Sequence, residues 1–211
     1  MKPAFTLTSK MFNLCVEIMG VLGRFQALNI TKPAPQLRRS NRIKTVQASL
    51  AIEGNTLLLD HVTSILDGKS VIGSRREIRE VQNTIKAYDQ IGSYNTRSPK
   101  SLREAHGILM EGLAPDAGKW RKSAVGIFQG DKLAHTAPQA KRVPELMDQL
   151  FDFISIERET HVLILSAVFH YELEFIHPFS DGNGRLGRLW QAALLTQLPP
   201  SNALLLIDKL A

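Results

Sequence analysis

The sequence predicts a mostly α-helical protein with one short β-hairpin. Most segments place apolar residues three and four positions apart, as SRREIREVQNTIKAYDQI does at residues 74–91, with charged residues on the opposite face. Glycine and proline separate these segments. Residues 123–135 differ, because Val125, Ile127 and Phe128 precede the turn sequence QGDK and then Leu133. We therefore expect a bundle of helices with a single hairpin.

The composition is that of an ordinary globular protein. Of its 211 residues, 44% are hydrophobic and 22% are charged, a size that corresponds to one or two domains. The formal net charge is +6 at pH 7. An excess this small and dispersed suits an anionic ligand or an acidic partner, and we expect no nucleic acid.

The chain has no sequence feature of secretion or membrane insertion. Its single cysteine, Cys15, precludes an intrachain disulfide and is typical of a reducing compartment, so we expect a cytoplasmic protein. The N-terminus does not follow the pattern of a signal peptide. The apolar stretch from Met11 to Phe25 includes Glu17 and Arg24 and is too polar to span a bilayer. We expect no membrane partner.

Eight helices are expected, with termini marked by capping residues, glycine or proline. They run from Ser9 to Leu28, Ser40 to Ile52, Leu57 to Leu66, Ser74 to Ile91, Ser101 to Leu113, Val143 to Ile156, Thr160 to Phe175 and Arg185 to Leu198.

Several of these termini carry specific expectations. Ser9, Ser74 and Ser101 are the expected N-caps, and a glutamate three residues after Ser74 completes a capping box. Gly54 is the expected left-handed C-cap of the second helix. Pro199 and the proline after it stop the last helix.

The stretch from Gly92 to Lys100 is the expected boundary between two parts of the chain. We expect an N-terminal helical segment at residues 1–96 and a core at residues 97–211. His106, in the first helix of that core, is interpreted as a partly buried structural histidine.

Twelve residues, HPFSDGNGRLGR at positions 177–188, carry the richest chemistry. Pro178 disfavours helical geometry at His177, so a helix should end there and leave an imidazole that titrates near neutral pH. The glycines that follow leave amide N–H groups free, and with the N-terminus of the next helix they form a nest for an anion.

The charged residues of this segment fit the same interpretation. Arg185 and Arg188 lie three positions apart on one helix face and can both reach a polyphosphate. Asp181 is a hard oxygen ligand suited to Mg²⁺ that bridges phosphates. Phosphate, metal and base together indicate a nucleotide enzyme.

Three other interpretations compete with this one. Gly182, Gly184 and Gly187 match a dinucleotide-binding fingerprint, which we reject because a helix precedes them and not a strand. His170, Glu174 and His177 fall at i, i+4 and i+7, a spacing that could hold zinc but arises easily by chance. A glycine-rich turn between two helices would explain the glycines but not the polar residues.

The twelve-residue segment resembles the signature of the Fic family, His-x-Phe-x-Asp/Glu-Gly-Asn-Gly-Arg-x-x-Arg, and agrees with it at every fixed position. The resemblance covers the chain from about Lys44 onward and implies a mostly α, Fic-like helical bundle with a β-hairpin called the flap. It implies transfer of AMP from ATP to a Ser, Thr or Tyr hydroxyl of a target protein, with release of pyrophosphate. Fic cores usually continue past the signature, so we expect a chain that ends at Ala211 to be truncated or minimal.

The resemblance also assigns roles to residues of the segment. His177 is the catalytic base that deprotonates the hydroxyl, and Asp181 holds Mg²⁺. Gly182, Asn183 and Gly184 cradle phosphate oxygens. The full nucleotide-binding set is Asp181, Gly182, Asn183, Gly184, Arg185, Leu186, Gly187 and Arg188.

A second stretch resembles the inhibitory motif of the family, Ser/Thr-x-x-x-Glu-Gly/Asn. It is SLAIEG, from Ser49 to Gly54. This resemblance implies that Glu53 forms a buried ion pair with Arg188 and that Ser49 hydrogen-bonds nearby and fixes the docking. The enzyme would then be inhibited in cis.

A third stretch, Gly118-Lys119-Trp120-Arg121, is similar in position and character to the residues that precede the family's flap. Val125, Gly126, Ile127 and Phe128 would then lie over the active site, and the target protein would bind along them.

The sequence leaves several functions open. Some members of the family transfer other phosphate-containing groups, and some remove AMP from modified targets. A nucleotide-binding regulatory protein without turnover and the toxin of a toxin–antitoxin pair also fit. The target and the oligomeric state, a homo-oligomer included, stay open.

Overall fold

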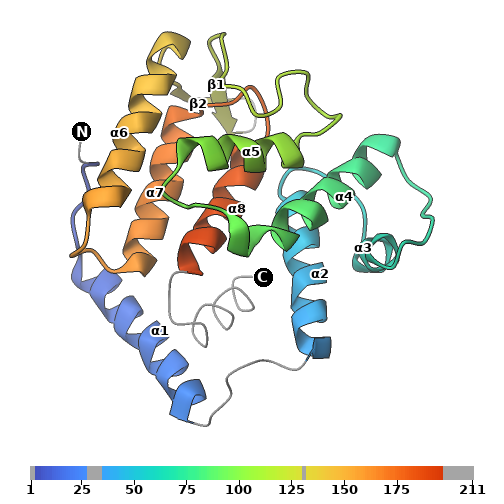
Figure 1. The fold of residues 1–211 in the computed structure, drawn as a ribbon, viewed down its shortest axis with the longest axis horizontal. Coiled ribbons are helices and arrows are strands. Elements are labelled where there is room, and N and C mark those ends of the chain that lie inside the picture. The colour runs from blue at the N-terminus through green and yellow to red at the C-terminus, as the bar shows by residue number, and fades with distance from the viewer. Residues whose placement is uncertain (1–2, 28–34, 130–131, 197–211) are drawn as a thin grey trace.

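Helices make up most of the chain that the computed structural model describes, which comprises residues 3–27, 35–129 and 132–196 (Figure 1). In chain order the helices are α1 (Ser9–Ala27), α2 (Pro35–Ala51), α3 (Leu59–Leu66), α4 (Arg75–Asp89), α5 (Pro99–Leu109), α6 (Val143–Ile156), α7 (Val162–Ile176) and α8 (Asn183–Leu195). Two short 3₁₀ helices, η1 (Ile91–Ser93) and η2 (Ala140–Arg142), follow α4 and precede α6.

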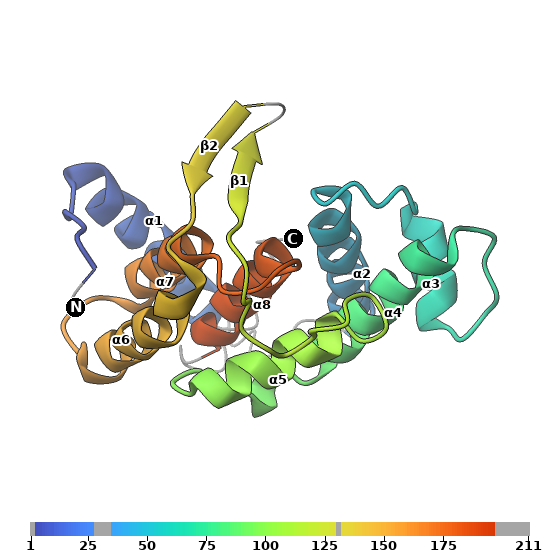
Figure 2. The ribbon, with the colours of Figure 1, turned by 90° about the horizontal axis from the view of Figure 1, so that it is seen from above.

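Helix α8 forms the centre of the fold. Figures 1 and 2 show it between α7 on one side and α2 on the other. Ten of its thirteen residues are buried, as a helix surrounded by others requires. Trp190 is fully buried and lies 6.3 Å from Phe151 and 6.5 Å from Phe169, measured between ring centroids. Because α8 is fixed in the core, so is the loop that leads into it.

A second, smaller core joins α2, α3 and α4. Val46, Leu50, Val62 and Val81 are buried together there. Farther along α4, Ala87 belongs to the main core. Helix α4 therefore connects the two cores, and α2 lies alongside the main one.

Two antiparallel strands, β1 (Gly126–Gln129) and β2 (Lys132–Thr136), project from the helices, as Figure 2 shows. Gly126 pairs with Thr136, and the register shifts between Ile127 and Phe128. The centre of the expected turn, residues 130 and 131, lies outside the described residues.

The eight expected helices are all present, with differences at their ends. Helix α2 begins at Pro35, five residues earlier than expected, because proline is tolerated in the first turn of a helix. Helix α8 begins at Asn183 and ends at Leu195. The expected end at Leu198 and the stop at Pro199 lie outside the described residues.

The capping predictions were partly wrong. Thr8, and not Ser9, caps α1, because its Oγ1 accepts a hydrogen bond from the backbone N–H of Met11 at 3.2 Å. Ser98, and not Ser101, caps α5, and its side chain accepts from the N–H of Ser101 at 3.3 Å. Several adjacent serines or threonines can each serve as the cap, and sequence alone does not choose among them.

Two other caps are confirmed. The side chain of Ser74 accepts a hydrogen bond from the N–H of Glu77 at 3.1 Å and caps α4. Gly54 follows α2 with a left-handed φ of 86°. Among the described residues, no helix is both long and apolar enough to span a membrane.

Candidate active site

His177 ends α7 in a left-handed backbone conformation, with φ 50° and ψ 62°. Among the described residues it is the one non-glycine residue with a positive φ. A non-glycine residue in this region is strained, and such strain persists where the surroundings enforce it, often at functional sites. The helix thus ends where Pro178 predicted that it would, and the imidazole lies at the start of the loop.

The imidazole of His177 is held in one tautomer. Its Nδ1 lies 3.3 Å from the carbonyl oxygen of Glu174, which only accepts hydrogen bonds, so Nδ1 carries the proton and Nε2 keeps its lone pair. Burial lowers the pKa of His177, and the carbonyl of Glu174 acts in the opposite direction. The ring is therefore neutral and able to accept a proton at neutral pH.

Asn183 ties the loop to the start of α8. Its side-chain oxygen accepts from the N–H of Phe179 at 3.0 Å, and its amide nitrogen donates to the carbonyl of Phe179 at 2.9 Å. Asn183 is 2% exposed. The side chain of Asn183 therefore fixes the loop, and the backbone N–H is the group of this residue that remains to face an anion.

Gly182 closes the loop with a φ of 81°. A Cβ atom here would lie 2.6 Å from the sulfur of Met110, so both the backbone angle and the close approach require glycine. Gly182 is the N-cap of α8, and the helix N-terminus that follows favours an anion.

His106 holds the loop from below, in a role that the sequence did not suggest. Its Nδ1 accepts from the N–H of Gly118 at 2.9 Å, so its Nε2 carries the proton and donates to the carbonyl of Asp181 at 2.9 Å. The ring stacks on Phe179 with centroids 3.6 Å apart. Burial lowers the pKa of His106 to about 4. At 1% exposed it is fully buried, not partly buried as predicted.

The carboxylate of Asp181 lies at the mouth of the loop, 46% exposed. Its Oδ1 accepts from the N–H of Gly182 at 2.6 Å and from Nη2 of Arg185 at 3.2 Å, and its Oδ2 lies 3.4 Å from Nη2 of Arg76. Arg76 comes from α4 and was not among the predicted site residues.

Arg185 and Arg188 have different partners. Arg185 is 4% exposed, and its guanidinium lies between Asp181 and Glu80, whose Oε1 is 3.6 Å away. We expected both arginines to reach a polyphosphate from one helix face. Arg185 is instead buried beneath the loop and binds Glu80 and Asp181. Arg188 is the more accessible of the two, with 23% of its side chain exposed.

Arg188 forms the predicted ion pair with Glu53. Its Nη2 lies 2.7 Å from Oε1 of Glu53 and 3.0 Å from the carbonyl oxygen of Ser49, and its Nε donates to Oγ of Ser49 at 3.0 Å. The pair is not buried as expected, because 32% of the Glu53 side chain is exposed at the end of α2. Ser49, at 4% exposed, supplies the buried part of the contact.

Gly184 leaves the space that the Glu53 carboxylate occupies. A Cβ atom at position 184 would lie 2.5 Å from Oε1 of Glu53 and 3.1 Å from Nη1 of Arg188. The carboxylate thus lies directly against the first turn of α8, where the anion nest was predicted.

Two members of the predicted nucleotide set lie away from the loop mouth. Leu186 is fully buried in the main core. Gly187 packs against α7, where a Cβ atom would lie 2.8 Å from Oε1 of Glu174. Neither side-chain position faces the loop mouth.

The donor set fits Mg²⁺ that arrives with a nucleotide. Mg²⁺ is commonly held by one or two carboxylates together with substrate phosphates and water. Asp181 supplies one accessible carboxylate, and within the described residues no three His, Cys, Asp or Glu side chains cluster to hold a metal on their own. His170 of the zinc interpretation bonds instead through Nδ1 to Oε1 of Gln191, at 2.9 Å.

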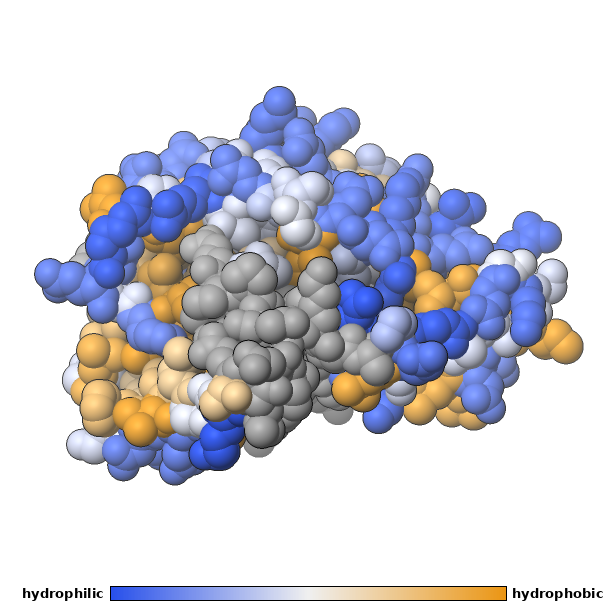
Figure 3. Space-filling model, turned by 60° about the horizontal axis from the view of Figure 1, so that its bottom comes forward, coloured by the Kyte–Doolittle hydropathy of each residue, from blue (hydrophilic) through white to orange (hydrophobic). Residues whose placement is uncertain are grey.

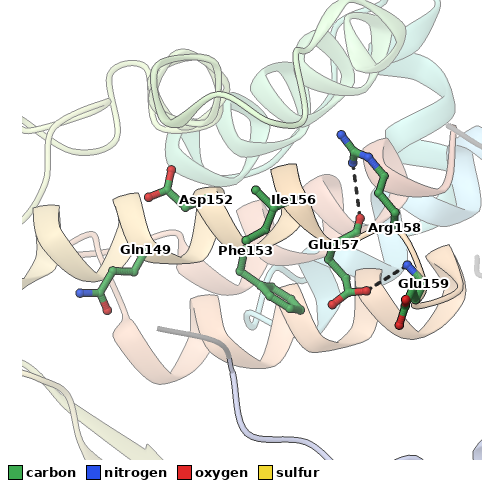
Figure 4. Close-up of a pocket in the computed structure, with 7 residues that line it drawn as sticks. All are labelled: Gln149, Asp152, Phe153, Ile156, Glu157, Arg158 and Glu159. Atoms are coloured by element: carbon green, nitrogen blue, oxygen red, sulfur yellow. Dashed lines mark hydrogen bonds between the residues drawn. The ribbon is translucent and has the colours of Figure 1, made fainter.

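Two pockets of the described residues lie elsewhere. One of about 440 Å³, at the end of α6, is lined largely by polar side chains, including Asp152, Glu157 and Arg158 (Figure 4). Another of about 860 Å³ lies beside α1, where Figure 3 shows hydrophobic side chains gathered at one end of the surface. Among the residues described, none from 177–188 lines either pocket.

Comparison with known proteins places this geometry in a family. The model of the Fic/DOC family matches residues 96–195, which contain the loop, His106 and the hairpin. A Fic family protein from Desulfovibrio desulfuricans is 46% identical and superposes with a TM-score of 0.92 over 100% of this chain and 64% of its own. The chain belongs to the Fic/DOC family.

Curated relatives of this Fic/DOC chain carry the name protein adenylyltransferase Fic. The one from Nematostella vectensis is 30% identical over 185 residues, which are 80% of this chain and 42% of the relative. The one from Culex quinquefasciatus is 31% identical over 164 residues, or 72% of this chain and 32% of the relative. The chain therefore spans less than half the length of these curated relatives.

Proposed function

We propose that this Fic/DOC chain transfers AMP from ATP to a Ser, Thr or Tyr hydroxyl of a target protein, and that Glu53 inhibits the transfer in cis. The observation that carries the proposal is the position of Arg188. Glu53 and Ser49 occupy the donors of this arginine, and Glu53 also lies close enough to His177 to act on its pKa. The names of the curated relatives support the AMP group.

His177 is the base. The hydroxyl oxygen of the target attacks the α-phosphorus of ATP, and the new O–P bond forms as the bond to the bridging oxygen breaks. The electron pair of that bond leaves with pyrophosphate, and the hydroxyl proton passes to Nε2 of His177. The hydrogen bond from Nδ1 to the carbonyl of Glu174 keeps Nε2 free for this role.

The phosphates bind between the loop and the first turn of α8. The backbone N–H groups of residues 183 and 184, in the first turn of α8, would donate to the anion, and Arg188 adds a charged donor. The N–H of Gly182 donates instead to Oδ1 of Asp181. Mg²⁺, when bound, neutralises charge on the phosphates, and Asp181 is the residue that would hold it. Arg185 would act from beneath the loop by holding the carboxylate of Asp181.

Glu53 blocks this arrangement by competing for Arg188. While its carboxylate binds Nη2, the guanidinium is unavailable to the γ-phosphate, and the carboxylate repels phosphate from the start of α8. The side chains of Arg188 and Glu53 are partly exposed, so burial alone does not account for the strength of their ion pair. Two hydrogen bonds to Ser49, one from Nε and one from Nη2, hold the guanidinium in place.

The hairpin would bind the target. An extended peptide can add to an exposed strand edge, and β1 and β2 project beside the loop. We propose that the flap comprises Val125, Gly126, Ile127 and Phe128, and that residues 97–211 form the catalytic part. Residues 1–96 would carry the inhibitory helix α2.

The decisive experiment compares three proteins, each incubated with α-³²P-labelled ATP, Mg²⁺ and a cell lysate. The parent should label lysate protein weakly, and Glu53→Gly should increase labelling by orders of magnitude. Adding His177→Ala to Glu53→Gly should reduce labelling by about 10²- to 10⁴-fold, as loss of a general base does.

Two results would contradict the proposal. If Glu53→Gly labels no more than the parent and binds ATP no better, the inhibitory role is wrong. If Glu53→Gly binds ATP but labels nothing with or without His177, the chain is a nucleotide-binding protein without transfer.

A further inference from the structure

Arg121 is a buried arginine that connects the hairpin to His177. It lies between α5 and β1, and 2% of the residue is exposed. Its guanidinium donates to four backbone carbonyl oxygens. These belong to His177 (2.7 Å), Ser123 (2.8 Å), Pro138 (2.6 Å) and Ile176 (3.3 Å).

The four carbonyls belong to three separate segments of the chain. Ser123 precedes β1, and Pro138 follows β2, so Arg121 holds both ends of the hairpin. The other two carbonyls belong to the end of α7 and to His177 itself. The backbone N–H of Arg121 also donates to the carbonyl of Pro178 at 2.9 Å.

These contacts explain how the strained backbone of His177 persists. A left-handed non-glycine residue is strained, and it persists where the surrounding structure enforces it. The Nε of Arg121 donates to His177, and its backbone N–H donates to the next residue, Pro178. The bond from the charged guanidinium to His177 is stronger than a bond between neutral groups and helps to hold this conformation.

Only arginine has the geometry for this arrangement. Its planar guanidinium presents five N–H donors in a fixed fork, so one side chain can bridge carbonyls on several sides at once. The acceptors are all main-chain oxygens, and their positions depend on the backbone and not on the side chains around them. Lysine would keep the charge but not the bridge.

We propose that Arg121 is a positioning residue that fixes the base of the hairpin and the imidazole of His177 as one rigid unit. The proposal rests on the proposed function, in which the hairpin holds the target and His177 accepts its proton. Hydroxyl and base must then meet within a few tenths of an ångström, and a shift of about 1 Å can cost roughly 10²-fold in rate. Arg121 touches neither ATP nor the hydroxyl, so it acts through the other two groups.

The test replaces Arg121 by lysine in the Glu53→Gly background and measures three quantities. Label transfer from α-³²P-labelled ATP to lysate protein should fall by about 10²-fold. The dissociation constant for ATP should change by less than about threefold, because Arg121 contacts no part of the anion nest. Backbone hydrogen exchange should rise at the ends of the hairpin and at residues 177–179, and stay unchanged in α8.

Arg142→Lys in the same background is the matched control. Arg142 is an exposed arginine that follows the hairpin, and its replacement makes the same change of side chain without touching Ser123, Pro138 or His177. Labelling and hydrogen exchange should match those of Glu53→Gly alone.

Two outcomes overturn the inference, and a third separates it from the proposed function. If Arg121→Lys labels as fast as its background, the charge suffices and the bridge is not needed. If hydrogen exchange rises everywhere and ATP affinity falls along with labelling, Arg121 only stabilises the fold. If Glu53→Gly itself labels nothing, the proposed function fails, and the exchange data still decide whether Arg121 joins the hairpin to His177.

Discussion

At the scale of single residues, the environment of His177 sets a pH dependence. Burial lowers its pKa below the ordinary value of about 6.5, and the guanidinium of Arg121 acts in the same direction. The carbonyl of Glu174 and the carboxylates of Glu53 and Asp181 oppose this effect. A neutral imidazole is the form that accepts the proton.

The transfer rate of Glu53→Gly should therefore rise with pH through a midpoint below 6.5 and be constant at neutral pH. Removing the Glu53 carboxylate removes one of the opposing effects, so the midpoint should not move upward. The measurement is the rate of label transfer at saturating ATP from pH 5 to 8. A midpoint above 7 would mean that another group, or a charged histidine, governs the reaction.

Asp181 and Arg188 should affect different ligands. In the Glu53→Gly background, Asp181→Ala should raise the Mg²⁺ concentration needed for half-maximal transfer, because it removes the accessible carboxylate at the loop mouth. Arg188→Ala should weaken ATP binding about 10- to 100-fold, since each charge-assisted hydrogen bond is worth about 1.5–3 kcal/mol.

Asp116→Ala is the control for the metal titration. The two carboxylate oxygens of Asp116 lie 2.8 and 2.7 Å from Oγ of Ser180 in the loop, whose hydroxyl donates to the carboxylate, but Asp116 lies outside the predicted metal site. Its Mg²⁺ curve should match that of the background. Identical Mg²⁺ curves for Asp181→Ala and the background would remove Asp181 from the metal site.

At the scale of elements, the proposed inhibition depends on two residues one turn apart, Ser49 in α2 and Glu53 just after it. Ser49→Ala removes the acceptor for Nε of Arg188 but leaves the Ser49 carbonyl and Glu53 in place. We expect partial activation, up to about 10-fold in transfer rate, because one hydrogen bond to a charged group is lost. Combining it with Glu53→Gly should add little, since both residues hold the same guanidinium.

The control is Thr45→Ala, one turn earlier on α2. Its Oγ1 donates to the carbonyl of Asn41 within the helix and does not reach Arg188. Thr45→Ala should leave the transfer rate at the parent value. Equal activation by Thr45→Ala and Ser49→Ala would show that general loosening of α2 causes the effect, and not the contact with Arg188.

The elements themselves could largely be predicted from the sequence. Helix spacing, Gly54 and Pro178 are local signals, and each marked a real boundary. The choice between Ser98 and Ser101 as a cap could not be made, because both residues can accept the same kind of hydrogen bond.

At the scale of the whole molecule, the site joins parts of the chain that are distant in sequence. The Glu53–Arg188 pair was predicted because the inhibitory and signature motifs are both local patterns. The contacts of Glu80 with Arg185, of His106 with Asp181 and of Arg121 with His177 carry no local pattern. They depend on how α4, α5 and the segment after it pack on α8, so sequence spacing alone could not reveal them.

The same packing connects the end of α2 to Asp181 in the loop. Nδ2 of Asn55, just after α2, donates to Oε2 of Glu80 at 2.9 Å, and Oε1 of Glu80 lies 3.6 Å from Arg185. Arg185 in turn holds Asp181. Undocking of α2 would thus free Arg188 directly and loosen Asp181 through two intermediate residues.

His106 should make the stability of the whole fold depend on pH. Its pKa is lowered to about 4 in the folded protein by burial, compared with about 6.5 in the unfolded chain. Between these values the unfolded chain binds a proton that the folded protein does not, so stability falls as pH drops from about 6.5 to about 4. The loss is on the order of 3 kcal/mol, at 1.36 kcal/mol for each pKa unit.

His106→Gln should remove this part of the pH dependence. A glutamine can still accept from Gly118 and donate to Asp181, but it does not titrate. The measurement is the free energy of unfolding in urea at pH 7 and pH 4.5 for both proteins. The parent should lose more stability than the variant, while His170 and His177, whose pKa values are also lowered by burial, contribute equally to both. If both proteins lose the same free energy of unfolding, His106 takes up its proton as readily in the folded protein as in the unfolded chain.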